Sequence, residues 1–90
     1  MEKPFAWNPD KNEQLKARHG FGFEDIVQVI EAEGILDNVA NPSASFPHQR
    51  LLIIRLEGYP IAVSYVENDE EIFLKTAFPN RKLKALYPES

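Results

Sequence analysis

Apolar residues follow a helical spacing in the first third of this 90-residue chain. The clearest case is an i, i+3, i+4, i+7 stripe made of Phe23, Ile26, Val27 and Ile30. This stripe predicts an amphipathic helix that runs to Glu33, and Gly34 is its expected stop. A shorter helix is predicted over 9–18, because Asn8 is a good N-cap and Pro9 suits the first helical position.

β-branched and aromatic residues gather in runs along the second half of the chain. Three such runs are separated by short turns: Gln49–Leu56, Tyr59–Val66 and Glu71–Phe78. They predict a three-stranded antiparallel meander. Shorter strands are expected at Phe5–Trp7 and within Ile35–Val39, and a two-turn helix is expected over Arg81–Tyr87.

Together these elements predict one α+β domain over residues 1–90. It comprises an N-terminal arm or strand, two helices, a twisted antiparallel sheet of three to four strands and a short C-terminal helix. One sheet face packs on the helices and the other is solvated or covered by a partner. The expected core residues are Ile26, Val27, Ile30, Leu52, Ile54, Ile72 and Leu74.

The third β-rich run has one polar face and one apolar face if its side chains alternate strictly. Under that alternation the core side carries Ile72, Leu74, Thr76 and Phe78. The opposite face then carries Phe73, Lys75 and Ala77. Trp7 is expected to be buried, where it anchors the N-terminal arm against the body.

The residue inventory excludes several classes of chemistry. The chain has no cysteine, so it has no disulfide scaffold, thiolate zinc site or cysteine nucleophile. It also lacks an EF-hand pattern, a glycine-rich phosphate loop and a Gly-x-Ser-x-Gly elbow. His19 and His48 do not have metal-ligand spacing, and we expect neither a metal nor a cofactor. Without an apolar leader or a membrane-length apolar run, a soluble, cytoplasmic protein is expected.

Charge is distributed unevenly along the chain, whose net charge is −4. Residues 24–49 carry five acids and no lysine or arginine, whereas the residues from Ile72 onward carry four cations and one acid. Cations on a sheet face and on the first turn of a helix can hold a phosphodiester, which would involve Lys75 and Arg81. The alternative is that these are ordinary solvated surface cations.

The order and spacing of short motifs resemble those of BrnT-type toxins over nearly the whole chain. The opening motifs are Phe5-Ala6-Trp7, Lys11-Asn12, Arg18-His19-Gly20 and Phe23-Glu24. The remainder is similar to a subgroup of that family through Pro47-His48-Gln49-Arg50, Glu57-Gly58-Tyr59, Ile72–Thr76 and Pro79-x-Arg81-Lys82.

This resemblance implies a RelE-like fold and a small metal-independent endoribonuclease that inhibits translation. Its partner would be a CopG-like ribbon-helix-helix antitoxin, and it would contact DNA only through that antitoxin. The RNA 2′-hydroxyl would attack its own phosphodiester, with Lys75 and Arg81 as phosphate stabilisers and Lys82 assisting. Further candidates follow from the same resemblance: Arg50 and His19 as additional site residues, and His48 or Tyr87 for proton transfer.

Two other classes of function are compatible with the sequence. One is a non-catalytic protein-binding module that acts with its antitoxin as a DNA-binding repressor complex, and the other is a structural or adaptor domain. A nuclease needs Lys75 and Arg81 to converge within about 10 Å around a cleft. A binding module needs only a surface for its partner, and the acidic stretch 24–37 suits a basic tail.

Overall fold

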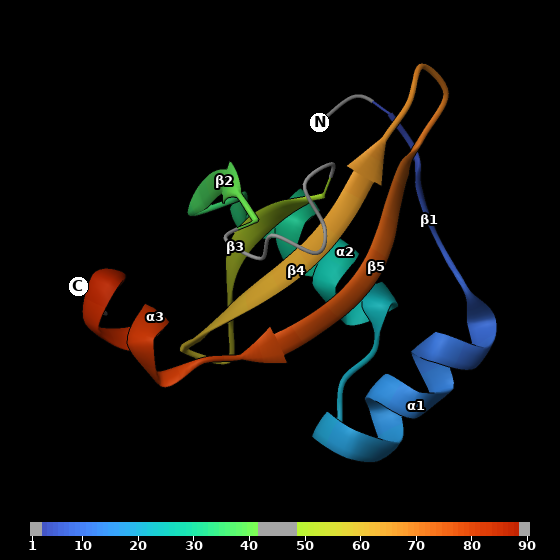
Figure 1. Cartoon of the computed structure of the whole chain (residues 1–90). Helices are drawn as coiled ribbons and strands as arrows, with labels where there is room; N and C mark the ends of the chain where they lie inside the picture. The colour runs from blue at the N-terminus through green and yellow to red at the C-terminus, as the bar shows by residue number, and fades with distance from the viewer. Residues whose placement is uncertain (1–2, 42–48, 89–90) are drawn as a thin grey trace.

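The described part of the chain, residues 3–41 and 49–88, forms five strands and three helices in a computed structural model (Figure 1). The elements follow one another as β1 (Phe5–Trp7), α1 (Pro9–His19), α2 (Phe23–Glu33), β2 (Asp37–Ala40), β3 (Arg50–Leu56), β4 (Tyr59–Glu67), β5 (Ile72–Pro79) and α3 (Arg81–Leu86). The α+β class is confirmed, and the predicted helices and β-rich runs are all present. None of the helices described has the length and apolar character that a membrane crossing requires.

The strands form a single sheet in the order β1-β5-β4-β3-β2. The predicted meander is the antiparallel run β3, β4 and β5, and β2 extends it antiparallel to β3. The expectation of an antiparallel sheet of three to four strands is wrong, because β1 joins as a fifth strand parallel to β5. The chain leaves β1 through α1 and α2 and re-enters the sheet at its opposite edge, which permits this parallel pairing.

A β-bulge interrupts the pairing of β4 with β5. Tyr65 pairs with Leu74 and Ser64 pairs with Thr76, so Lys75 is the extra residue. The bulge reverses the alternation of the following side chains. The predicted faces are therefore wrong beyond this point: Ala77 belongs to the helix-side core, whereas Thr76 is half-buried on the face opposite to it and Phe78 is 37 % exposed.

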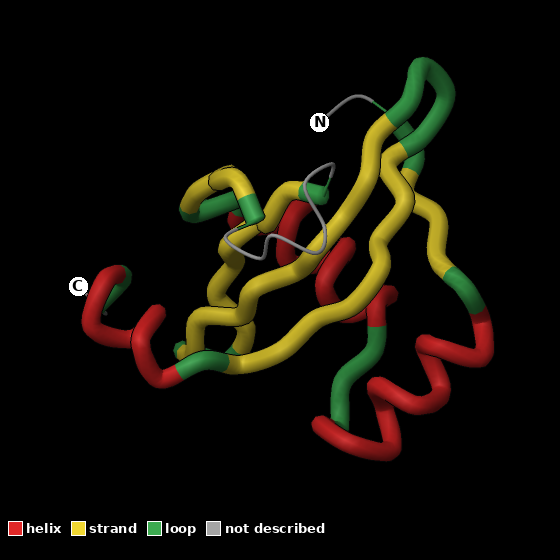
Figure 2. The backbone as a smooth tube through the Cα atoms, viewed as in Figure 1, coloured by secondary structure: helices red, strands yellow, loops and turns green. Residues whose placement is uncertain are grey.

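The main core lies between the sheet and its helices, with α2 behind the sheet in the view of Figures 1 and 2. Of the expected core residues, all are buried except Val27, which is half-buried and packs at the margin. A smaller cluster covers part of the second face, where Leu83 and Tyr87 from the C-terminal region pack on Leu51, Ile53 and Ala62. Trp7 is half-buried, and its ring centroid lies 5.9 Å from that of Phe23.

A buried amide joins α1 to the start of α2. Asn12 is 7 % exposed; its Oδ1 accepts a hydrogen bond from the Phe23 amide at 2.7 Å, and its Nδ2 donates to Glu24 at 2.7 Å. Lys16 forms an ion pair with the same Glu24 carboxylate. A Cβ atom on Gly22 would lie 2.7 Å from both Asn12 Oδ1 and Lys16 Cε, so this junction has no room for a side chain there. We call these contacts the Asn12 clasp.

Substitution of Asn12 by alanine should destabilise the protein by about 1–3 kcal/mol, because it leaves the buried Phe23 amide without an acceptor. The free energy of unfolding from urea titration measures this effect. Glu13→Ala changes an exposed neighbour on the same helix and should alter stability by no more than about 0.5 kcal/mol. Equal losses in the two variants would contradict a special role for the Asn12 clasp.

Acid should weaken the Asn12 clasp through Glu24. Hydrogen bonds from Lys16 and then Asn12 lower the pKa of Glu24 from 4.5 to about 2. Because the folded-state pKa is the lower one, the carboxylate stabilises the fold above pH 4.5, and this contribution is lost as the pH falls toward 2. The difference in unfolding free energy between wild type and Glu24→Gln should therefore shrink across that range.

The control for this pH series is Glu31→Gln, which changes an exposed residue on the same helix. Its difference from wild type should vary much less with pH than that of Glu24→Gln. Identical pH profiles for the two variants would show that the carboxylate of the Asn12 clasp makes no special contribution.

Candidate phosphate-binding groove

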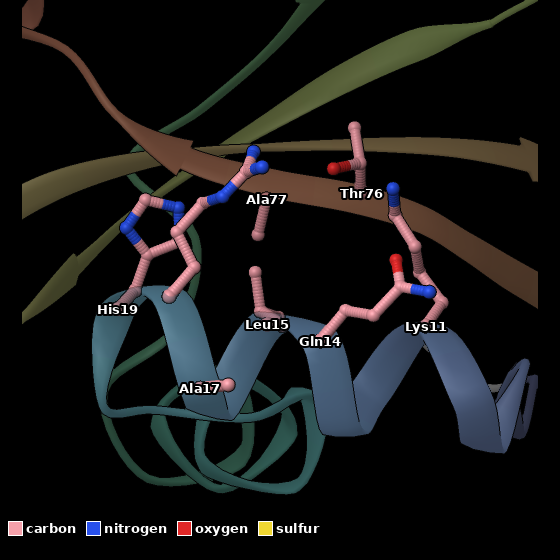
Figure 3. Close-up of a pocket in the computed structure, with 8 residues that line it drawn as sticks. Lys11, Gln14, Leu15, Ala17, His19, Thr76 and Ala77 are labelled. Carbon is pink, nitrogen blue, oxygen red and sulfur yellow. The ribbon is translucent and has the colours of Figure 1, made fainter.

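The outer edge of β5 is open along its second half. β1 pairs only with Ile72–Leu74, and no other described strand lies on that side of β5. Helix α1 runs beside this open edge, and the two are separated by a groove of about 470 Å³ (Figure 3). Its lining residues are Lys11, Gln14, Leu15, Ala17, Arg18, His19, Thr76 and Ala77. We call it the α1–β5 groove.

Polar side chains from one face of α1 extend into the α1–β5 groove. Figure 3 shows Lys11, Gln14 and His19 directed from α1 toward β5. One face of α1 carries Lys11, Gln14 and Arg18, because these residues are three and four positions apart. Ala77 points from β5 toward Leu15, and these two buried residues form the apolar floor. The result is an apolar base beneath a rim of hydrogen-bond donors.

The α1–β5 groove is positively charged although the protein as a whole is negative. None of its lining residues is acidic, and no ion pair among the described residues involves Lys11 or Arg18. Lys75 stands at the bulge of β5, with its ammonium 5.2 Å from the centre of the Phe73 ring, and it lines two adjoining hollows together with Lys11. Three cations therefore surround this edge of the sheet. Asp10 lines one of the adjoining hollows with Lys11 and Lys75, but no ion pair among the described residues joins it to either lysine.

Two of the residues implied by the resemblance lie at or beside the α1–β5 groove. Lys75 is exposed at its β5 side. His19 lies at the last position of α1, and its ring stacks on that of Phe21 with a centroid separation of 5.5 Å. This stacking holds the imidazole at the mouth of the groove. His48 lies outside the described residues.

The other predicted site residues lie elsewhere. Arg50 uses its guanidinium to bond Asn38, with Nε 2.9 Å from the side-chain oxygen. Arg81 and Lys82 are exposed on the first turn of α3, beyond the end of β5. The two hollows that Lys75 lines do not include Arg81.

Tyr87 has a structural environment. Its hydroxyl donates a hydrogen bond of 2.5 Å to Asp37, which raises the pKa of Tyr87 and lowers the pKa of Asp37. Its carbonyl accepts a bond from Arg55 at 3.1 Å. These contacts tie the end of α3 to β2 and β3. They favour a Tyr87 phenol that stays protonated and hydrogen-bonded to Asp37.

The cations of α1 are absent from the prediction based on sequence. Lys11, Gln14 and Arg18 are spaced as one helical face, which was a usable signal. What the sequence did not indicate is that this face lies beside an unpaired strand edge, because the pairing of β1 with β5 joins residues far apart in the chain.

Comparisons with family models, curated proteins and solved structures found no match. The function of the groove is therefore argued from its own chemistry. No group of three or more metal-ligating side chains gathers within residues 3–41 and 49–88. Lysine and arginine side chains around a shallow groove are suited to bind a phosphate group, and an imidazole beside them can exchange a proton with a bound substrate.

Tyr87→Phe should lower the melting temperature, because it removes the hydrogen bond that tethers α3 to Asp37. It should leave binding of inorganic phosphate to the groove unchanged, as measured by NMR titration. If the variant instead kept its stability and lost phosphate binding or RNA cleavage, Tyr87 would be part of the site rather than a tether.

Proposed function

We propose that this protein is the toxin of a toxin–antitoxin pair and acts as a metal-independent endoribonuclease that inhibits translation. The observation that carries the proposal is the α1–β5 groove, in which Lys11 and Arg18 have no acidic partner among the described residues and His19 stands beside them. The resemblance of the sequence to BrnT-type toxins points to the same activity. An RNA phosphodiester is the substrate that matches this combination of cations and an imidazole.

In the proposed reaction the RNA supplies its own nucleophile. The 2′-oxygen forms a bond to the adjacent phosphorus while the bond from phosphorus to the 5′-oxygen breaks. His19 accepts the proton of the 2′-hydroxyl, and the departing 5′-oxygen takes a proton from water. Lys11, Arg18 and Lys75 stabilise the additional negative charge on the phosphate oxygens. The products are a 2′,3′-cyclic phosphate and a 5′-hydroxyl end.

Purified protein should cleave single-stranded RNA and leave 2′,3′-cyclic phosphate ends. The double variant Lys11→Gln with Arg18→Gln should reduce the cleavage rate by about 10²–10³-fold, because each cation stabilises the transition state. The matched variant Arg81→Gln with Lys82→Gln removes the same amount of charge from α3. The resemblance to BrnT-type toxins implies that these two residues bind the phosphate. We expect it to retain most of the activity.

The same variants separate the possible outcomes in cells. Expression without a partner should arrest growth, and the α1 double variant should relieve the arrest while remaining folded by circular dichroism. Relief by the α3 pair alone would place the phosphate site at α3 instead of in the groove. A folded wild type that neither cleaves RNA nor arrests growth would refute the endoribonuclease.

The proposed partner is a small ribbon-helix-helix antitoxin with a basic segment, and the proposed compartment is the cytoplasm, where RNA is translated. α2 offers exposed carboxylates at Glu31 and Glu33, and charge contrast with a basic segment would accelerate association. These acids also favour the second candidate function, a non-catalytic module that acts with its antitoxin as a DNA-binding repressor. If this protein binds a ribbon-helix-helix antitoxin tightly but has no ribonuclease activity, the result would favour the repressor module over the endoribonuclease.

A further inference from the structure

Ser64 is a buried polar residue without a partner. It lies on β4 opposite Thr76, it is 2 % exposed, and its Oγ forms no hydrogen bond with any described residue. Its neighbours Val63 and Tyr65 belong to the helix-side core, so the Ser64 side chain is directed to the second face of the sheet. A buried hydroxyl that lacks a partner destabilises a fold, so its presence in the middle of a strand requires an explanation.

Ser64 lines a hollow of about 430 Å³ on that second face. We call it the second-face hollow, and its lining residues are Lys11, Asn41, Gln49, Ser64, Lys75, Thr76 and Phe78. Phe78 contributes a ring that the bulge has turned away from the core, and it is 37 % exposed. The hollow therefore combines an aromatic surface, hydroxyl and amide groups, and two lysines.

The second-face hollow adjoins the α1–β5 groove at the open edge of β5. Lys11 and Thr76 line both cavities. A nucleotide with its phosphate in the groove would therefore have its base within reach of the hollow.

We propose that the second-face hollow binds a nucleobase of the RNA whose phosphate occupies the α1–β5 groove, and that Ser64 discriminates between bases. The inference rests on the proposed function. Phe78 provides a stacking surface, which is the usual way in which proteins hold an unpaired base. The Ser64 hydroxyl can donate to or accept from the polar edge of the base, which supplies its missing partner. An aliphatic peptide side chain would fill the same space but leave that hydroxyl unsatisfied.

The lysines also favour a nucleotide over an apolar protein segment as the occupant. Lys75 and Lys11 both line the second-face hollow, and no described residue of its lining is acidic. A phosphate bonded to the bound nucleoside would lie against these ammonium groups. The Phe78 ring, the Ser64 hydroxyl and the two lysines thus match the plane of the base, its polar edge and the phosphate of a nucleotide.

The test is titration of the full chain with each of the four nucleoside 5′-monophosphates and with inorganic phosphate, followed by NMR. One monophosphate should bind more tightly than the other three and more tightly than phosphate. Ser64→Ala should reduce the preference among the bases by about tenfold, because the discriminating hydrogen bond is lost. Phe78→Ala should weaken all four monophosphates by about tenfold, because stacking tolerates any base.

Two controls distinguish binding from folding. Ser64→Ala removes a hydroxyl that has no partner, so its melting temperature should equal or exceed that of wild type. Leu86→Ala truncates another exposed apolar residue, at 69 % exposure on α3, and should leave all affinities unchanged. Neither Ser64→Ala nor Phe78→Ala should alter the binding of inorganic phosphate.

The outcomes separate this inference from the proposed function. If RNA is cleaved but all four monophosphates bind alike in wild type and Ser64→Ala, the base-discriminating role is overturned and the endoribonuclease stands. If one monophosphate is preferred through Ser64 but RNA is not cleaved, the hollow is supported and the catalytic proposal fails. If no monophosphate binds, and Phe78→Ala weakens only a protein partner, the hollow is a protein-docking surface and the inference is wrong.

Discussion

The amide side chain of Asn12 is the interaction on which the functional surface depends. It is buried between the two helices, where it accepts a bond from the Phe23 amide and donates one to Glu24. A helix of eleven residues is marginal alone in water, and α1 buries little apolar surface besides Leu15. The Asn12 clasp fixes α1 against α2 and so contributes, together with the pairing of β1 to β5, to the position of α1 beside β5.

The bulge at Lys75 is the second constraint, and it acts on the sheet rather than on the helix. One extra residue in β5 turns Phe78 out to the second face and keeps Ala77 in the core. Regular alternation would have placed the phenyl ring on the helix-side face of the sheet. Because β1 stops pairing at Leu74, one residue before the bulge, the same short segment has both an open edge and an exposed ring.

Local features of this fold were predictable from the sequence, and features created by distant contacts were not. The N-cap at Asn8, the apolar stripe of α2 and the β-rich runs depend on neighbouring residues, and each appears in the structure. The parallel pairing of β1 joins residues more than sixty positions apart, and no local pattern encodes it. The bulge also depends on contacts between strands, so the faces predicted beyond Lys75 were wrong. Because the pairing of β1 was not predicted, the sequence did not indicate that α1 lines the groove.

The negative charge of the whole molecule does not conflict with a surface that binds phosphate. Acids such as Glu31, Glu33 and Asp69 are exposed, and no described acid lines the groove itself, although Asp10 lines an adjoining hollow. At physiological ionic strength, charges farther apart than about 8 Å are largely screened, so a bound phosphate is influenced mainly by the cations next to it. Acids elsewhere on the surface would discourage loose association of the proposed RNA substrate with the rest of the protein. An acidic body with one basic edge therefore favours a defined contact, and a base held beside that edge would determine which nucleotide is bound there.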